Sequence, residues 1–183
     1  MQVFFYNLRT FFWGINFYKK AILDIDILPS MKVLDIGCGT GNLALNINRM
    51  YNPNFIVCYD SSIEQIKYAR KRNVHFNSNI SFVLASMTDP CFKNSVFDLV
   101  FSSLVIHTVN DAFYESILRN IKMLLKENGL FIFIDFKWLP KTLYRAEWNF
   151  SNIVHYIEDF NFKCVKRNHL SCFIERAIFI NKK

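Results

Sequence analysis

The chain has 183 residues, of which 52% are hydrophobic and 17% aromatic, and this composition excludes a disordered or low-complexity protein. Its net charge of +7 leaves an acidic partner such as nucleic acid open, but the basic residues lie in scattered groups, so this reading is not favoured. The five cysteines include no Cys-x-x-Cys pair, which predicts no disulfide framework and no metal site, and favours a cytoplasmic location.

The chain is expected to form one domain (1–183), in which residues 1–28 are a helical cap and residues 31–183 are the core. Apolar side chains recur near the N-terminus at three- and four-residue intervals, for example at Phe4, Leu8 and Phe11, which is the spacing of an amphipathic helix up to about residue 23. Polar residues interrupt this stretch, so it predicts neither a membrane span nor a signal peptide.

From Met31 onward, short apolar runs alternate with helical patterns. Strands are expected over residues 31–36, 55–59, 80–85, 96–102 and 130–134. This alternation predicts an α/β fold with a doubly wound, mostly parallel sheet. Two final strands, at about 162–167 and 172–180, are joined by a short link and are expected to form an antiparallel edge pair. The sheet would then have about seven strands.

Capping residues set the expected limits of two helices. Ser61-x-x-Glu64 has the form of a capping box and predicts a helix that runs to about Arg72. Asp111 is expected to cap a later amphipathic helix, which Asn128-Gly129 would close before the fifth strand.

Chemistry is concentrated where the first two strands end. Asp35 lies within the first apolar run, and Gly37, Gly39 and Gly41 follow before a helix begins. Glycines allow positive φ angles and a close approach of the backbone to a ligand. A helix N-terminus adds free N–H groups and a partial positive charge. Asp60 ends the second strand, where its carboxylate can accept two hydrogen bonds from a ribose diol.

A nicotinamide-nucleotide protein is one alternative, because Gly39-x-Gly41-x-x-Ala44 fits the dinucleotide-binding pattern and Asp60 supplies the acidic residue. That pattern alone is a weak signal. Asp35 argues against it, since a dinucleotide fingerprint does not need a charge inside the strand.

The segment Val33–Gly41, reading VLDIGCGTG, resembles the first motif of class I S-adenosylmethionine-dependent methyltransferases. Asn94–Val100 is similar to that family's fourth-strand motif, and Leu104–His107 is similar to the segment after that strand. Leu124–Leu130 resembles the exit from helix to strand five, so the match runs in order through residues 30–136. The resemblance implies a Rossmann-like fold and S-adenosyl-L-methionine as the cofactor, with S-adenosyl-L-homocysteine as its product.

The resemblance also implies roles for single residues. The glycine turn would surround the methionine part of the cofactor, Asp60 would hold the ribose hydroxyls, and Ser102 to Leu104 would face the sulfonium. Family members often carry an acidic residue for the adenine where this chain has Ser86. The implied cofactor-binding residues are Asp35, Gly37, Cys38, Gly39, Gly41, Asp60, Ser61, Ser86, Met87, Ser102 and Leu104.

His107 is the candidate general base, since it follows the fourth strand and imidazole titrates near neutrality, although a structural histidine is an equally good interpretation. Asp135, at the end of the fifth strand, is the second candidate. The chain lacks the Asn/Asp-Pro-Pro-Tyr motif that accompanies methylation of exocyclic or amide nitrogens. The favoured function is in-line methyl transfer to an oxygen, nitrogen or carbon atom of a small molecule. The alternative acceptors are nucleic acid and a carrier-bound acyl group.

Overall fold

The computed structural model describes residues 14–73, 79–89, 92–139 and 148–182. The part of the predicted helical cap before Gly14 lies outside these residues, and the helix expected up to residue 23 is observed as α2. The helices are α2 (Gly14–Ile22), α3 (Asn42–Tyr51), α4 (Ile63–Asn73), α5 (Tyr114–Leu124) and α6 (Phe150–Asp159), with 3-10 turns η1 (Ile106–Thr108) and η2 (Asp111–Phe113).

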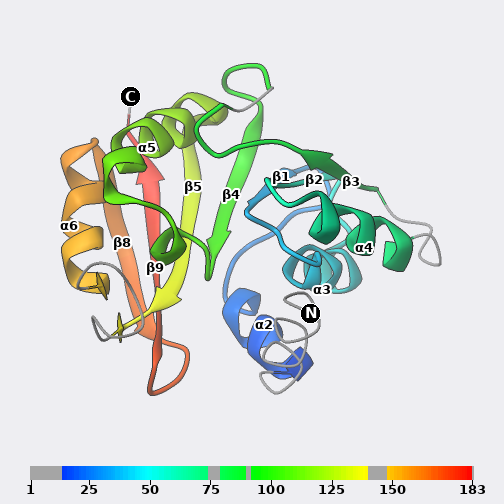
Figure 1. Ribbon diagram of the computed structural model, residues 1–183, viewed down its shortest axis with the longest axis horizontal. Coiled ribbons are helices and arrows are strands. Elements are labelled where there is room, and N and C mark those ends of the chain that lie inside the picture. The colour runs from blue at the N-terminus through cyan, green and yellow to red at the C-terminus, as the bar shows by residue number, and fades with distance from the viewer. Residues whose placement is uncertain (1–13, 74–78, 90–91, 140–147, 183) are drawn as a thin grey trace.

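Seven strands form one sheet in the order β3-β2-β1-β4-β5-β9-β8 (Figure 1). The strands are β1 (Lys32–Ile36), β2 (Phe55–Asp60), β3 (Ile80–Leu84), β4 (Phe97–Ser103), β5 (Leu125–Phe136), β8 (Phe162–His169) and β9 (Ile174–Asn181). The first five pair in parallel, and β9 pairs antiparallel with both β5 and β8. The predicted mostly parallel sheet with an antiparallel edge pair is therefore confirmed.

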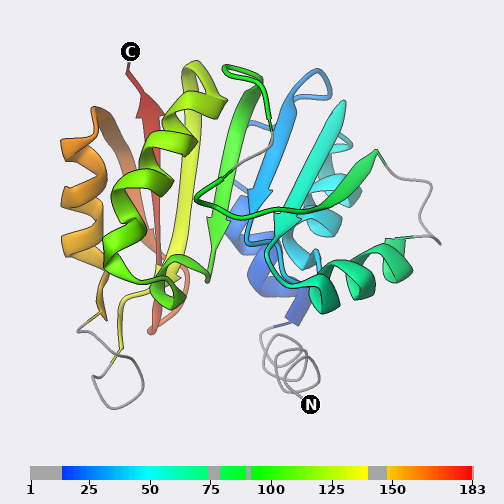
Figure 2. The ribbon, with the colours of Figure 1, turned by 45° about the horizontal axis from the view of Figure 1, so that its top comes forward.

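The strand order reverses between β1 and β4, because the chain first builds outward through β2 and β3 and then returns to the other side of β1. In an open α/β sheet such a reversal opens a crevice beyond the carboxyl ends of the strands. Figure 2 shows the carboxyl ends of β1, β4 and β5 along one edge of the sheet, with η1 and η2 beside them.

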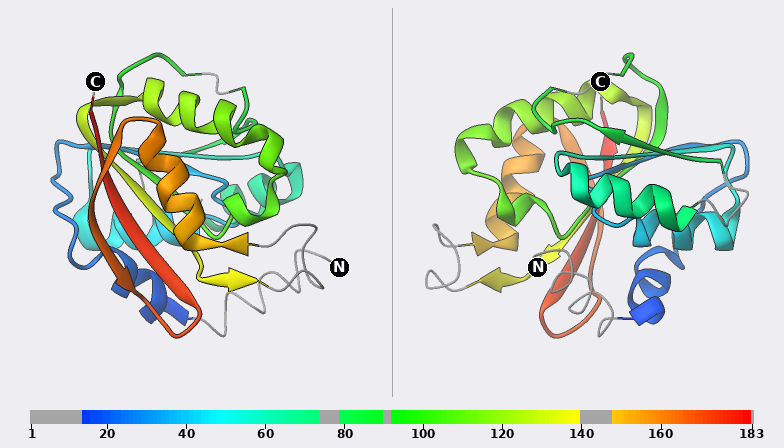
Figure 3. Two further views of the ribbon diagram at one scale, coloured as in Figure 1. Left: turned by 90° about the vertical axis from the view of Figure 1, so that its left-hand side faces the viewer. Right: turned by 45° about the vertical axis from the view of Figure 1, so that its right-hand side comes forward.

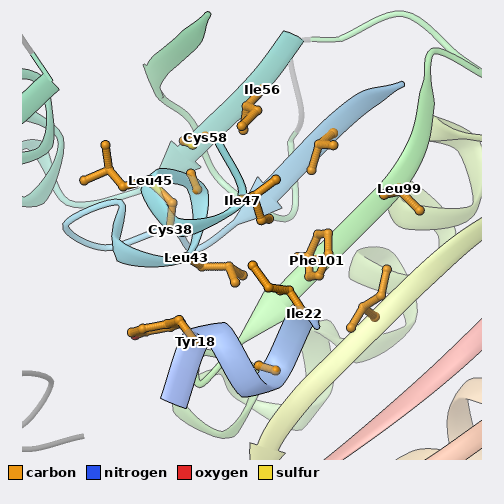
Figure 4. Packing of buried hydrophobic residues seen from close by; sticks show 14 of the residues in the cluster. Tyr18, Ile22, Cys38, Leu43, Leu45, Ile47, Ile56, Cys58, Leu99 and Phe101 are labelled. Carbon is orange, nitrogen blue, oxygen red and sulfur yellow. The ribbon is translucent and has the colours of Figure 1, made fainter. Parts of the chain in front are cut away.

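Helices cover the sheet on both faces, which explains the almost continuous apolar runs of the central strands. The helices α2, α3 and α4 lie on one face of the sheet and α5 and α6 on the other (Figure 3). Their buried side chains belong to two separate core layers. Figure 4 shows Ile22 of α2 and Leu43 of α3 near Phe101 of β4. Along β5 the alternation is clear, since Phe133 faces α6 and Ile134 faces the α2 side.

Both predicted helix starts differ from the observed ones. The N-cap of α4 is Ser62 rather than Ser61, because the Ser62 hydroxyl accepts the backbone N–H of Gln65 at 3.3 Å. The carboxylate of Asp60 takes the Ser62 N–H at 2.9 Å, which places the start of the helix one residue later. Before α5, the side chains of Asn110 and Asp111 both accept the N–H of Ala112 in η2, at 3.0 and 2.8 Å, and α5 itself begins after Phe113.

The helix α5 ends four residues earlier than Asn128. Leu125 already pairs with Phe97 of β4, so the chain changes from helix to strand there and β5 starts before the predicted fifth strand. A two-residue ladder between β6 (Trp138–Leu139) and β7 (Trp148–Asn149) was not predicted. No helix in the described ranges is long and apolar enough to cross a membrane.

An ion pair between a buried guanidinium and a partly exposed carboxylate fastens α2 to the sheet. The guanidinium of Arg176 is fully buried and donates to both carboxylate oxygens of Asp24, at 2.5 and 2.7 Å. It also donates to the carbonyl of Ala21 at 2.7 Å. The hydrogen bond from Arg176 holds the pKa of Asp24 well below its usual range. These contacts fix the end of α2 beside the carboxyl ends of the strands.

Candidate active site

A groove of about 530 Å³ lies over the carboxyl ends of β1 to β4. Seven of the predicted cofactor-binding residues line it: Gly37, Gly39, Asp60, Ser61, Ser86, Met87 and Leu104. Four others do not line it, namely Asp35, Cys38, Gly41 and Ser102, and all four are buried. The glycine turn thus forms part of the wall of a groove that is open to solvent.

The glycine turn depends on Gly37 for its shape. Gly37 has φ +64°, and a Cβ atom there would lie 2.4 Å from the side chain of Val105, which also lines the groove. A side chain at this position would therefore meet both an unfavourable backbone conformation and a steric clash. Only glycine lets the Val105 segment close on the turn.

Asp60 links the turn to the start of α4. One carboxylate oxygen accepts the backbone N–H of Gly39 at 2.9 Å and the other accepts that of Ser62 at 2.9 Å. A carboxylate oxygen accepts more than one hydrogen bond, so each keeps capacity for a further donor. Because Asp60 also lines the groove, its carboxylate is held in place to receive two hydroxyl groups.

Asp35 is buried near this turn. Its exposed fraction is 1%, and within the described residues its Oδ2 atom has no hydrogen-bond partner. Burial, with the negative charge of Asp60 as a second cause, raises the pKa of Asp35 to about 8. A buried acceptor without a donor is costly, and a cationic ligand would relieve that cost. The turn, Asp60 and Asp35 together fit a ligand with a ribose and an ammonium group, as S-adenosylmethionine has.

His107 and Asp135, predicted separately as candidate bases, form one pair. The Nδ1 atom of His107 lies 2.6 Å from a carboxylate oxygen of Asp135, and the side chains are 5% and 0% exposed. The imidazole packs edge-on against Phe136 and Trp148, at 5.0 and 5.9 Å between ring centroids. The contact with the carboxylate orients the imidazole, and a proton on Nδ1 would leave the lone pair on Nε2. The ring does not line the groove, although Thr108, the next residue, does.

Ser86 and Ser102, expected beside the adenine and the sulfonium of the cofactor, have hydroxyl groups in different surroundings. The Ser86 hydroxyl lies 2.8 Å from the Thr88 hydroxyl and accepts the Thr88 N–H at 3.2 Å, so it already closes a local turn. Ser102 is fully buried, and its hydroxyl has no partner within the described residues. Leu104 lies in the groove wall with φ +57°, and its N–H donates to the carbonyl of Ile134 at 2.8 Å.

Further groove residues were not identified from the sequence. They include Gln65 on α4, Thr108 and Val109 after β4, and Phe113 in η2. None lies at a strand end or in a motif that carries a chemical signature. Phe113 lines the groove and is 50% exposed. A large apolar side chain that is exposed beside a groove indicates a ligand contact, and this becomes visible only in the folded structure.

Comparisons with known proteins agree with this geometry. A family model described as a methyltransferase domain matches residues 27–172. Phosphoethanolamine N-methyltransferase 1 of Arabidopsis thaliana is 26% identical over 70% of this chain and 26% of its own length. Carboxy-S-adenosyl-L-methionine synthase of Campylobacter fetus is 30% identical over 63% of this chain and 49% of its own. The chain thus spans about a quarter to a half of the length of these relatives.

Solved structures show the same fold. A SAM-dependent methyltransferase from Aquifex aeolicus aligns with a TM-score of 0.79 over 92% of each chain, at 15% identity. Geranyl diphosphate C-methyltransferase from Streptomyces coelicolor, solved with S-adenosyl-L-homocysteine, aligns with a TM-score of 0.73 over 86% of this chain and 74% of its own, at 11% identity. Since the family model covers most of the sequence, the chain belongs to the methyltransferase-domain family.

Proposed function

We propose that this protein transfers a methyl group from S-adenosyl-L-methionine to a small-molecule acceptor. One observation carries the proposal. A glycine turn is fixed by the carboxylate of Asp60, beside the buried Asp35, whose Oδ2 atom has no partner within the described residues, at the point where the strand order reverses. The relatives named above are named after small molecules, phosphoethanolamine and carboxy-S-adenosyl-L-methionine. We infer that the acceptor of this protein is a small molecule as well.

Each part of the groove has a distinct role in this proposal. Asp60 holds the two ribose hydroxyls, and the N–H groups of the turn hold the amino-acid end of the cofactor. Asp35 does not line the groove, and its buried carboxylate contributes negative charge near the ammonium group. Ser61, Ser86 and Met87 border the adenine. When bound, the cofactor supplies a methyl group activated by a sulfonium. The protein's main contribution is then positioning, since holding two reactants in line is worth about 7–11 kcal/mol.

His107 is the proposed general base and Asp135 its positioning residue. The short contact between them holds the imidazole in one orientation and favours a proton on Nδ1, so Nε2 can accept a proton from the acceptor. We expect His107→Gln to lower turnover by about a hundredfold or more while the affinity for S-adenosylhomocysteine stays the same. His155→Gln is the matched control, because His155 is 79% exposed. Unchanged turnover in His107→Gln would remove this residue as the base.

The choice of cofactor is tested by calorimetry on the wild-type protein. S-adenosylhomocysteine is expected to bind with a micromolar dissociation constant, and NADH is expected not to bind. The comparison is needed because Gly39-x-Gly41-x-x-Ala44 also fits the dinucleotide pattern. Binding of NADH without binding of S-adenosylhomocysteine would overturn the proposal.

A further inference from the structure

A second cavity lies near the carboxyl end of β5, between α2 and the β8–β9 hairpin. Its volume is about 390 Å³, and the described residues that line it are Lys20, Lys137, His169, Leu170, Ser171 and Cys172. These come from three segments that are far apart in the sequence. Figure 3 shows α2 beside the tip of the hairpin, and Figure 2 places both near the edge of the sheet where β5 ends. No acidic residue is among the described residues that line this cavity.

Both lysines lie beside the cavity without a carboxylate partner among the described residues. The ammonium of Lys20 donates to the backbone carbonyl of Leu170 at 2.7 Å, which anchors it at the rim without neutralising it. Lys137 has no carboxylate within ion-pair distance among the described residues, and its backbone is fixed on both sides. Its N–H donates to Phe173 at 2.8 Å and its carbonyl accepts from Phe150 at 3.0 Å. Two such cations beside one cavity attract an anion.

The nearby carboxylates are engaged by other cations. Glu175 is 2% exposed, and its Oε2 atom accepts hydrogen bonds from the guanidinium of Arg167 at 2.7 and 2.5 Å. Its Oε1 atom lies 3.3 Å from Nδ1 of His169, which leaves Nε2 of that ring unengaged by Glu175. Asp24 is held by Arg176 and by Lys166. Neither carboxylate is therefore left to balance the two lysines.

We propose that this cavity binds the phosphate group of the methyl acceptor. The assignment rests on the proposed function, since it names the class of molecule that the same enzyme would methylate. Ammonium groups act as point charges and suit a phosphate dianion, whereas a carboxylate is matched best by the planar fork of a guanidinium, which this cavity lacks. The Ser171 hydroxyl and the His169 imidazole add hydrogen-bonding groups at the same cavity.

The position of the cavity fits an acceptor of limited size. Lys137 follows Asp135 by two residues at the end of β5, and Asp135 holds the proposed base. Lys137 lies in a bend just after β5, so the two residues of chain span at most roughly 7 Å. Phe136, between them, contacts the ring of His107. Because the cavity and His107 lie this close together, one compact acceptor could place its phosphate in the cavity and its nucleophile near His107.

Inorganic phosphate is the probe for this site. The resonances of His169, assigned with a His169→Gln variant, are followed by NMR while phosphate is added to the full chain. We expect a saturable shift, and a dissociation constant raised at least about tenfold in the double variant Lys20→Ala/Lys137→Ala. The matched control is Lys19→Ala/Lys163→Ala, which removes the same charge from exposed lysines that do not line the cavity. This control is expected to change the affinity less than about threefold.

Several results would overturn the assignment. They are a shift that does not saturate, an equal loss of affinity in both double variants, or acetate that binds as tightly as phosphate, which would indicate a carboxylate site. Binding of S-adenosylhomocysteine is measured on the same samples and is expected to be unchanged in both double variants. If the wild type fails to bind it, the proposed function fails, whereas loss of phosphate binding alone refutes only the acceptor site.

Discussion

Replacing Asp35 by asparagine should make the ligand-free protein more stable than the wild type, and increasingly so as the pH rises. Asp35 is 1% exposed, its Oδ2 atom has no partner within the described residues, and its pKa is raised to about 8 by burial and then by the charge of Asp60. Asparagine has nearly the same shape and carries no charge at any pH. The substitution therefore removes the titrating carboxyl group and changes the packing very little.

The magnitude follows from proton linkage. Between about pH 4 and about pH 8 an aspartate in the unfolded chain is ionised, whereas the folded protein keeps the Asp35 proton. Unfolding then releases a proton, so the free energy of unfolding falls by about 1.4 kcal/mol per pH unit as the pH rises. The loss levels off above about pH 8, where folded Asp35 ionises too. From about pH 5.5 to about pH 7.5, the advantage of Asp35→Asn should grow by about 2–3 kcal/mol.

Urea denaturation of the ligand-free proteins at these two pH values measures the effect. Asp26→Asn is the control, because Asp26 is exposed and its replacement removes the same charge from the chain. The difference in unfolding free energy between Asp35→Asn and the wild type is compared at the two pH values. If that difference is the same at both, Asp35 does not hold a proton in the folded protein and the reasoning is wrong.

Two further substitutions test the contacts that shape the site. Gly37→Ala should lower the free energy of unfolding by about 1–3 kcal/mol and weaken cofactor binding, because its Cβ would lie 2.4 Å from the Val105 side chain at a positive φ. Adding Val105→Ala should restore part of the stability. A Gly37→Ala protein as stable as the wild type would contradict the clash. Asp24→Ala should lower the free energy of unfolding, measured with urea, by about 2 kcal/mol, because the buried guanidinium of Arg176 loses its carboxylate partner. This value already allows for the partial exposure of Asp24. No measurable loss would show that the pair does not fasten α2 to the sheet.

Much of the fold was predictable because each central strand is buried on both faces. Such strands appear in the sequence as short apolar runs, as at residues 31–36, and helices must lie between them if they are parallel. The end of α5 was not predictable from local signals, because Leu125 leaves the helix to pair with Phe97, which is 28 residues earlier in the chain. The placement of β9 between β5 and β8 is likewise a matter of long-range pairing.

The site was predictable where backbone chemistry dictates the residue. Glycines with positive φ and an acidic residue at a strand end leave a direct trace in the sequence, and Gly37 and Asp60 lie together in the groove as expected. The pairing of His107 with Asp135 was not visible, since it depends on β5 reaching alongside η1. The cavity at Lys20 and Lys137 was also invisible, because residues 117 positions apart meet there only through the fold.

The most direct measurement is a calorimetric titration of S-adenosylhomocysteine into the wild type, Asp60→Asn and the exposed control Asp26→Asn. Asp60 is held by Gly39 and Ser62 in a position to receive two ribose hydroxyls, and a hydrogen bond to a charged group is worth about 1.5–3 kcal/mol. We expect micromolar binding to the wild type and the control, and binding weaker by about tenfold or more in Asp60→Asn. A folded wild type that does not bind, or an Asp60→Asn variant that binds as tightly as the wild type, would contradict the assignment of this groove.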